Sequence, residues 1–124
     1  MIDHVLIYVC NLPESKQFYE KTFAAFGYGI AFGEKEKFWS FDIGNGALFE
    51  IAQHLKKDNV TPCHIAFRAK NKEQVDEFYK KAIEAGGICN GPPGPRPKYT
   101  QNYYAAFILD PSGHNIEAVF DSKP

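Results

Sequence analysis

Two histidines and two glutamates in this sequence have the types and spacing to bind a divalent metal ion. His4 and His64 lie 60 residues apart, in the similar segments DHVLI and CHIAF. Glu50 and Glu117 follow them in ALFEIA and HNIEAV, each shortly after a turn that contains glycine. Two imidazoles and two carboxylates make a mixed nitrogen and oxygen ligand set with no net charge once a divalent ion is bound. Such ligands suit Zn, Ni, Co, Mn or Fe(II), and the sequence does not distinguish among these metals.

The two glutamates stand where an apolar strand would normally carry an apolar side chain. In the alternation of a strand, Glu50 shares a face with Leu48 and Ala52. Removing an unpaired carboxylate from water costs several kcal/mol, and a divalent ion would offset that cost. A single strand histidine is more often a hydrogen-bonded core or rim residue, and a glutamate at a strand end is usually solvated. Four such residues in matching positions favour the metal site.

The sequence repeats itself at the offset that separates the two histidines. At 60 residues, Phe18 and Tyr19 match Phe78 and Tyr79, and Gly27 matches Gly87. Self-similarity of this kind predicts two copies of one supersecondary unit. His54 and His114 have no counterpart in the other copy, so we expect both of them at the surface.

Each copy has the pattern of a β-α-β-β-β unit. Hydrophobic alternation, helix caps and turn residues predict the elements of the first copy: a strand over 2–9, a helix from Asn11 to Gly27, and strands near 29–32, 38–43 and 47–53. The second copy predicts a strand over 63–69, a helix from Asn71 to Gly86, and strands near Ile88 and over 103–109 and 115–120. Residues 91–102, GPPGPRPKYTQN, contain too much proline and glycine for a helix or central strand, so we expect a stiff loop there.

Composition and charge narrow the class of protein. A chain of 124 residues is the size of one domain, and we take 1–124 as one domain with modules 1–56 and 62–122. The formal net charge of -1 and the dispersed basic residues argue against nucleic acid and membrane partners. Three cysteines without a C-x-x-C pair, and the lack of an apolar leader, predict a cytoplasmic protein with reduced thiols.

Several long segments resemble the vicinal oxygen chelate superfamily, which includes glyoxalase I, bleomycin-resistance proteins and extradiol dioxygenases. They are IDHVLIYVCNLPESKQFYEKTFAAFGY, PCHIAFRA and DPSGHNIEAVF. The resemblance implies an α+β fold of two tandem βαβββ modules with curled mixed β-sheets. It also implies that His4, Glu50, His64 and Glu117 occupy the four metal-ligand positions of glyoxalase I. In small members of the superfamily the complete site is commonly formed across a homodimer.

The resemblance further implies a metal-dependent lyase or isomerase whose small substrate is chelated through adjacent oxygens. Glu117 or Glu50 would then be the catalytic base. A dioxygenase or thiol transferase on the same scaffold, or a non-catalytic protein that binds a drug or metabolite, are the alternatives. No segment matches the glutathione-contacting residues of glyoxalase I. Charged and aromatic residues in and beside the loop 91–102 instead suggest contacts with an anionic or aromatic substrate: Arg96, Tyr99, Tyr103 and Tyr104.

Overall fold

The chain folds into two successive units with the same order of elements. The computed structural model describes residues 1–122. The first unit consists of β1 (His4–Val9), α1 (Leu12–Phe23), the short 3₁₀-helix η1 (Ala24–Phe26), β2 (Gly29–Glu34), β3 (Phe38–Asp42) and β4 (Leu48–Gln53). The second consists of β5 (His64–Arg68), α2 (Lys72–Glu84), β6 (Ile88–Pro95), β7 (Tyr103–Leu109) and β8 (Asn115–Asp121). The β-α-β-β-β order predicted for each copy is therefore confirmed.

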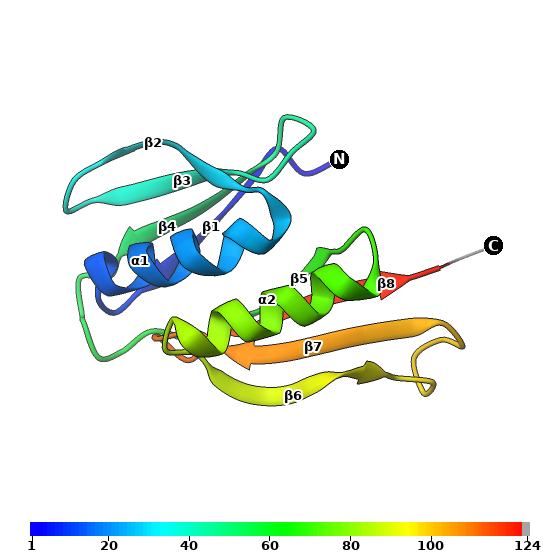
Figure 1. Cartoon of the computed structure of the whole chain (residues 1–124). Helices are drawn as coiled ribbons and strands as arrows, with labels where there is room; N and C mark the ends of the chain where they lie inside the picture. The colour runs from blue at the N-terminus through cyan, green and yellow to red at the C-terminus, as the bar shows by residue number, and fades with distance from the viewer. Residues whose placement is uncertain (123–124) are drawn as a thin grey trace.

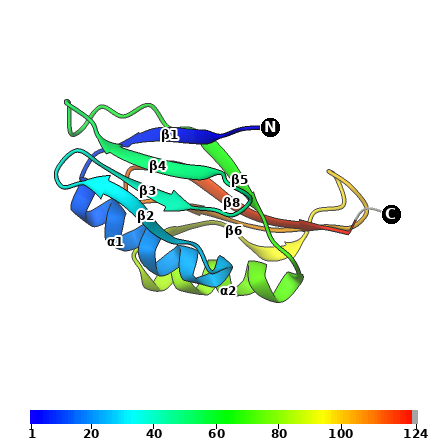
Figure 2. The ribbon, with the colours of Figure 1, turned by 90° about the horizontal axis from the view of Figure 1, so that it is seen from above.

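Each unit forms a four-stranded mixed sheet. The strand orders are β1-β4-β3-β2 and β5-β8-β7-β6. The first strand of each unit runs parallel to the last one, and the other neighbours are antiparallel. Figure 1 shows the two sheets with α1 and α2 in front of them, and Figure 2 shows that both helices lie on the same side of the sheets. In the part of the chain that the structure describes, no helix covers the other face of either sheet. The α+β class predicted from the sequence is confirmed.

The caps predicted from the sequence begin both helices. The Asn11 side chain accepts a hydrogen bond from the Glu14 amide at the start of α1, and Asn71 accepts one from the Gln74 amide at the start of α2. Such bonds satisfy amides that have no partner within the helix. After η1 the chain turns at Gly27, whose φ of 75° lies in the left-handed region that favours glycine.

One apolar core joins the two units beneath the helices. The side chain of Phe67 on β5 contacts aromatic rings of the first unit, with centroid distances of 5.1 Å to Phe23 and 5.4 Å to Phe49. All three side chains are buried. Because this core draws on both helices and both sheets, it fixes the position of one sheet relative to the other.

A buried polar cluster also links the units. The Tyr19 hydroxyl of α1 donates to Asp110 Oδ2, 2.5 Å away, in the turn between β7 and β8. His114 Nδ1 accepts from the Cys63 amide, so its Nε2 carries the proton and donates to the Tyr8 carbonyl of β1 at 2.8 Å. His114 is only 1% exposed, so the expectation that it lies at the surface is wrong. The sequence indicates that His114 is in a hairpin, but not that this hairpin packs against β1 of the other unit.

The expectation of a loop over 91–102 is wrong for its first part. Residues up to Pro95 belong to β6, the outermost strand of the second sheet. An edge strand tolerates proline because its outer side has no neighbouring strand to which a backbone amide would have to donate. The pairing of β6 with β7 shifts register twice, between Cys89 and Gly91 and between Gly91 and Gly94, so the strand absorbs these residues as irregularities.

Replacing Tyr19 by phenylalanine is expected to lower the free energy of unfolding by about 2 kcal/mol, because a buried carboxylate loses its hydroxyl donor. Burial raises the pKa of Tyr19 well above its usual range, and the negative charge of Asp110 adds to the increase, so the hydroxyl keeps the proton that it donates. Tyr104→Phe is the matched control, because its hydroxyl bonds Asp76 at the exposed surface. Urea unfolding of both variants measures the effect, and equal stability of the two would contradict this account.

Candidate functional site

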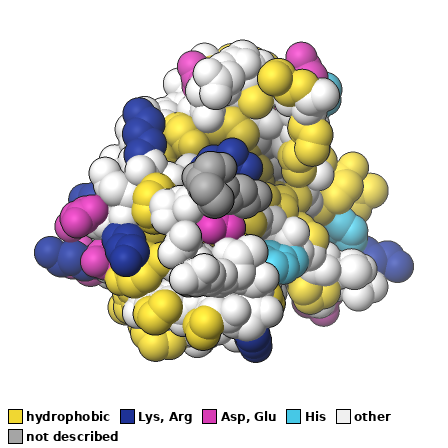
Figure 3. All heavy atoms as spheres, turned by 90° about the vertical axis from the view of Figure 1, so that its right-hand side faces the viewer, with side chains coloured by type: hydrophobic (Ala, Val, Ile, Leu, Met, Phe, Trp, Pro, Cys, Tyr) yellow, Lys and Arg dark blue, Asp and Glu magenta, His cyan; other side chains and the backbone are white. Residues whose placement is uncertain are grey.

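The candidate residues lie on the sheet faces that the helices leave open. Along β1, the side chains of Leu6 and Tyr8 are exposed, whereas Ile7 and Val9 point into the core. His4 is on the same exposed side of this alternation as Leu6 and Tyr8. The end view in Figure 3 shows histidine side chains next to hydrophobic ones toward its right-hand side, away from the helices. The open faces therefore combine polar ligand-type side chains with apolar surface.

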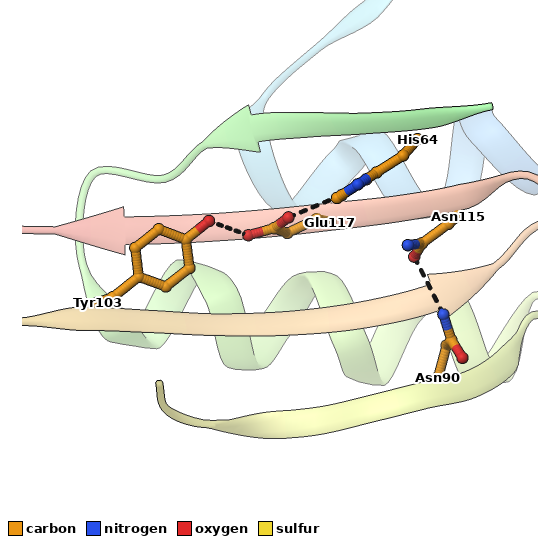
Figure 4. A network of polar contacts seen from close by, with 5 residues as sticks. All are labelled: His64, Asn90, Tyr103, Asn115 and Glu117. Atoms are coloured by element: carbon orange, nitrogen blue, oxygen red, sulfur yellow. Dashed lines mark hydrogen bonds and ion pairs between the residues drawn. The ribbon is translucent and has the colours of Figure 1, made fainter. Parts of the chain in front are cut away.

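His64, Glu117 and Tyr103 form a line of hydrogen bonds across three neighbouring strands (Figure 4). His64 Nε2 on β5 lies 2.8 Å from Glu117 Oε1 on β8. The Tyr103 hydroxyl on β7 donates to Glu117 Oε2. Only 3% of the glutamate side chain is exposed, compared with 53% of the histidine side chain. The carboxylate thus lies at the base of the open face, and the imidazole is accessible to a ligand.

Burial reinforces the protonated state of the tyrosine in this line. It raises the pKa of Tyr103 far above its usual range, and the hydrogen bond to Glu117 adds to the increase. The hydroxyl therefore remains protonated at neutral pH and acts as a donor to the carboxylate.

His4 and Glu50 repeat in the first sheet the arrangement of His64 and Glu117 in the second. His4 is opposite Leu48 in the pairing of β1 with β4, two residues before Glu50. In the second sheet, His64 has the same offset from Glu117. His4 Nδ1 lies 2.8 Å from Asp3 Oδ1, and this hydrogen bond raises the pKa of His4, with a smaller contribution from the charge of Glu50. The bond to Asp3 leaves Nε2 of His4 free to bind a ligand.

A single chain does not bring the four proposed ligands together. Within residues 1–122 no group of three or more His, Cys, Asp or Glu side chains is close enough to hold a metal ion. What each sheet offers is half of a site, an imidazole and a carboxylate on one face. The donor chemistry nonetheless fits a divalent ion, because Glu117 is a buried carboxylate whose ion pair within the described residues is with a histidine, not with lysine or arginine.

The residues predicted to bind substrate divide between the two faces of the second sheet. Arg96 lies on the open face, with its guanidinium 5.5 Å from the ring centre of Phe107, the residue opposite Glu117. It donates to the carbonyls of Pro92, Gly94 and Pro95, so its charge is held in place along β6. Tyr99 packs its ring against Tyr103 at 5.0 Å. Tyr104 lies on the other face, where its hydroxyl donates to Asp76 of α2.

Sequence reasoning missed a pair of asparagines beside the histidine. Asn90 Nδ2 on β6 donates to Asn115 Oδ1 on β8 at 3.2 Å (Figure 4). Asn115 is the residue paired with His64, so both amides lie at the rim of the same face. Asn115 could have been found, because it shares a strand face with Glu117. Asn90 could not, because the register shifts of β6 determine its position.

Comparisons with known proteins agree with this architecture. The sequence model of the glyoxalase/bleomycin resistance protein/dioxygenase superfamily matches residues 1–118. A glyoxalase/bleomycin resistance protein from Albidiferax ferrireducens T118 is 29% identical, with a TM-score of 0.82, and the match covers 100% of this chain and 99% of that one. A lactoylglutathione lyase from Agrobacterium tumefaciens is 18% identical, with a TM-score of 0.73 and coverage of 97% and 92%.

A third solved structure, a glyoxalase-related enzyme from Fulvimarina pelagi, is 20% identical, with a TM-score of 0.75 and coverage of 97% of this chain and 87% of that one. At such low identity the second and third structures show a shared fold alone. No curated protein is similar enough to count as a match. Within the described residues, no helix has the length and apolar character to cross a membrane.

Proposed function

Because the chain belongs to the glyoxalase/bleomycin resistance protein/dioxygenase superfamily, we propose that it is a metal-dependent lyase or isomerase acting on a small substrate chelated through adjacent oxygens. The observation that carries this proposal is the buried carboxylate of Glu117 beside His64 on an open sheet face. The same offset of His4 and Glu50 in the other sheet supports it. The family model covers both pairs of residues.

We propose that two copies of the chain complete the site as a homodimer. Each chain presents two half-sites, and a full set of ligands requires the first unit of one chain to face the second unit of its partner. Exposed apolar side chains beside His4 support such contact, since Leu6 is 43% and Tyr8 53% exposed on that face. His4, Glu50, His64 and Glu117 would hold one divalent ion, of Zn, Ni, Co, Mn or Fe.

The proposed chemistry is proton transfer next to a carbonyl group. When bound, the ion would act as a Lewis acid and stabilise negative charge on the substrate oxygens. Glu117 would remove the proton from carbon and return it to the neighbouring carbon, with Glu50 as the alternative base. His4 and His64 would stay in place as ligands. Arg96, with its charge fixed on the open face, would attract an anionic part of the substrate.

The cytoplasm remains the compartment that we propose, because all three cysteines, Cys10, Cys63 and Cys89, are free thiols. Reduced thiols are expected where glutathione and thioredoxin act.

For the substrate, we propose a small 2-oxoaldehyde adduct or another compound with adjacent oxygens. The sequence offers no counterpart of a glutathione site.

A heterodimer of two inactive variants tests the shared site. His4→Ala disables the first unit and Glu117→Gln the second, so each homodimer should lose nearly all turnover of a methylglyoxal hemithioacetal. A heterodimer isolated through two different tags has one site built entirely from intact residues. It should therefore recover about half of the wild-type turnover per dimer, because one of two sites is restored. If each chain instead held its own complete site, both sites of the heterodimer would be damaged and it would be inactive.

A further inference from the structure

We propose that Tyr103 is a positioning residue that holds Glu117 by one carboxylate oxygen and leaves the other for a bound ion. The proposal rests on the proposed function as far as the ion is concerned, and on the geometry of the second sheet for the rest. Tyr103 was predicted from the sequence to contact substrate, but its hydroxyl donates to Glu117 Oε2.

The two oxygens of the carboxylate have different surroundings. Oε1 lies 2.8 Å from His64 Nε2, on the side of the accessible imidazole. Oε2 is on the opposite side, where the Tyr103 hydroxyl occupies it (Figure 4). Oε1 is therefore the oxygen that would be left for an ion held by His64 and the glutamate. Tyr103, by holding Oε2, would favour binding through that one oxygen.

The surroundings of Tyr103 keep its hydroxyl in place. Its ring packs edge to face against Tyr99, with ring centroids 5.0 Å apart. Its strand, β7, lies between β6 and β8, so its backbone is paired on both sides. A rigid donor of this kind restricts the glutamate more strongly than a water molecule or a mobile surface side chain would.

The first sheet has no equivalent tyrosine. In the second sheet Glu117 pairs with Phe107, and Tyr103 is four residues before Phe107. In the first sheet the residue that pairs with Glu50 is Ser40. The residue four positions before Ser40 is Glu36, which lies in the turn before β3 and cannot donate a hydroxyl. Glu50 is also less buried than Glu117. The two carboxylates of the proposed site are thus constrained differently, and within residues 1–122 a tyrosine holds Glu117 but not Glu50.

Tyr103→Phe tests this role, with Tyr104→Phe as the matched control on the same strand. The Tyr104 hydroxyl bonds Asp76 on the other face, so its loss should leave the site unchanged. In calorimetric titration with Ni²⁺ or Mn²⁺, Tyr103→Phe should bind the ion about tenfold to a hundredfold more weakly than the wild type, as expected when the partner of a ligand is removed. The control should bind within about twofold of the wild type. Equal affinity of all three proteins would overturn the proposal.

A measurement without metal separates this proposal from the proposed function. In the proton NMR spectrum of the metal-free protein, a hydroxyl bound to a buried carboxylate should give a resolved low-field resonance. This resonance should be absent from Tyr103→Phe, shifted in Glu117→Gln and unchanged in Tyr104→Phe. If the wild type bound no divalent ion but showed this pattern, the proposed metal-dependent function would be contradicted. The proposed hydrogen bond from Tyr103 to Glu117 would still be supported. A resonance that did not change in Glu117→Gln would contradict the proposed positioning of Glu117 by Tyr103.

Discussion

Glu117→Gln is expected to reduce turnover of a methylglyoxal hemithioacetal about a thousandfold, because it removes the group proposed to take the proton. The substitution keeps the size of the side chain and an oxygen that can accept from Tyr103, so the fold should remain intact. Glutamine cannot serve as a base and is a weaker ligand for a divalent ion. The loss should therefore appear in kcat, and in the affinity for metal as well.

The control for this variant is Glu84→Gln, which removes the same charge from the exposed end of α2. It should keep full turnover, and both variants should melt within a few degrees of the wild type, as surface and isosteric changes usually do. Steady-state kinetics with thermal unfolding on the same preparations provide both readouts. If Glu117→Gln retained full turnover, the assignment of Glu117 as the base would be wrong.

The sequence predicts the repeat and its elements because the signals for them are local. The sequence places the helix starts at Asn11 and Asn71, and both caps are confirmed. These features depend on residues a few positions apart. The pairing of each histidine with its glutamate also follows from the repeat, since both units place the last strand beside the first.

The features that the sequence did not predict depend on contacts between distant segments. His114 is buried because its hairpin packs against β1, and no pattern near residue 114 encodes that contact. The residues 91–95 form a strand because β6 lies at an edge, where proline is tolerated. The contact between Tyr103 and Glu117 depends on the register between β7 and β8. In that register Tyr103 pairs with Asp121, four residues after Glu117.

The open faces also bear on the choice among the reactions of this superfamily. The half-sites present two glutamates as well as two histidines, whereas an extradiol dioxygenase, by resemblance, would use two histidines and one glutamate. Glu50 occupies the additional position, so the proposed ligand set favours a lyase or isomerase. The fixed charge of Arg96 and the asparagine pair at the rim favour a polar, anionic substrate over a purely apolar drug.

The central claim is that two imidazoles and two carboxylates, supplied by two copies of the chain, bind one divalent ion. Metal analysis of protein purified without chelators or added metal tests it most directly, by mass spectrometry of the metal content and by titration of the stripped protein. Because each dimer would have two shared sites, we predict about one divalent ion per chain, and a large loss of binding in both His4→Ala and His64→Ala.

The two histidine variants distinguish a shared site from a site in one unit. If only the second unit bound the ion, His64→Ala would lose binding and His4→Ala would keep it. Lys80→Ala, on the exposed side of α2, is a control that should bind as the wild type does. A content of less than about a tenth of an equivalent per chain, with no binding of added Ni, Zn, Co, Mn or Fe(II), would contradict the account.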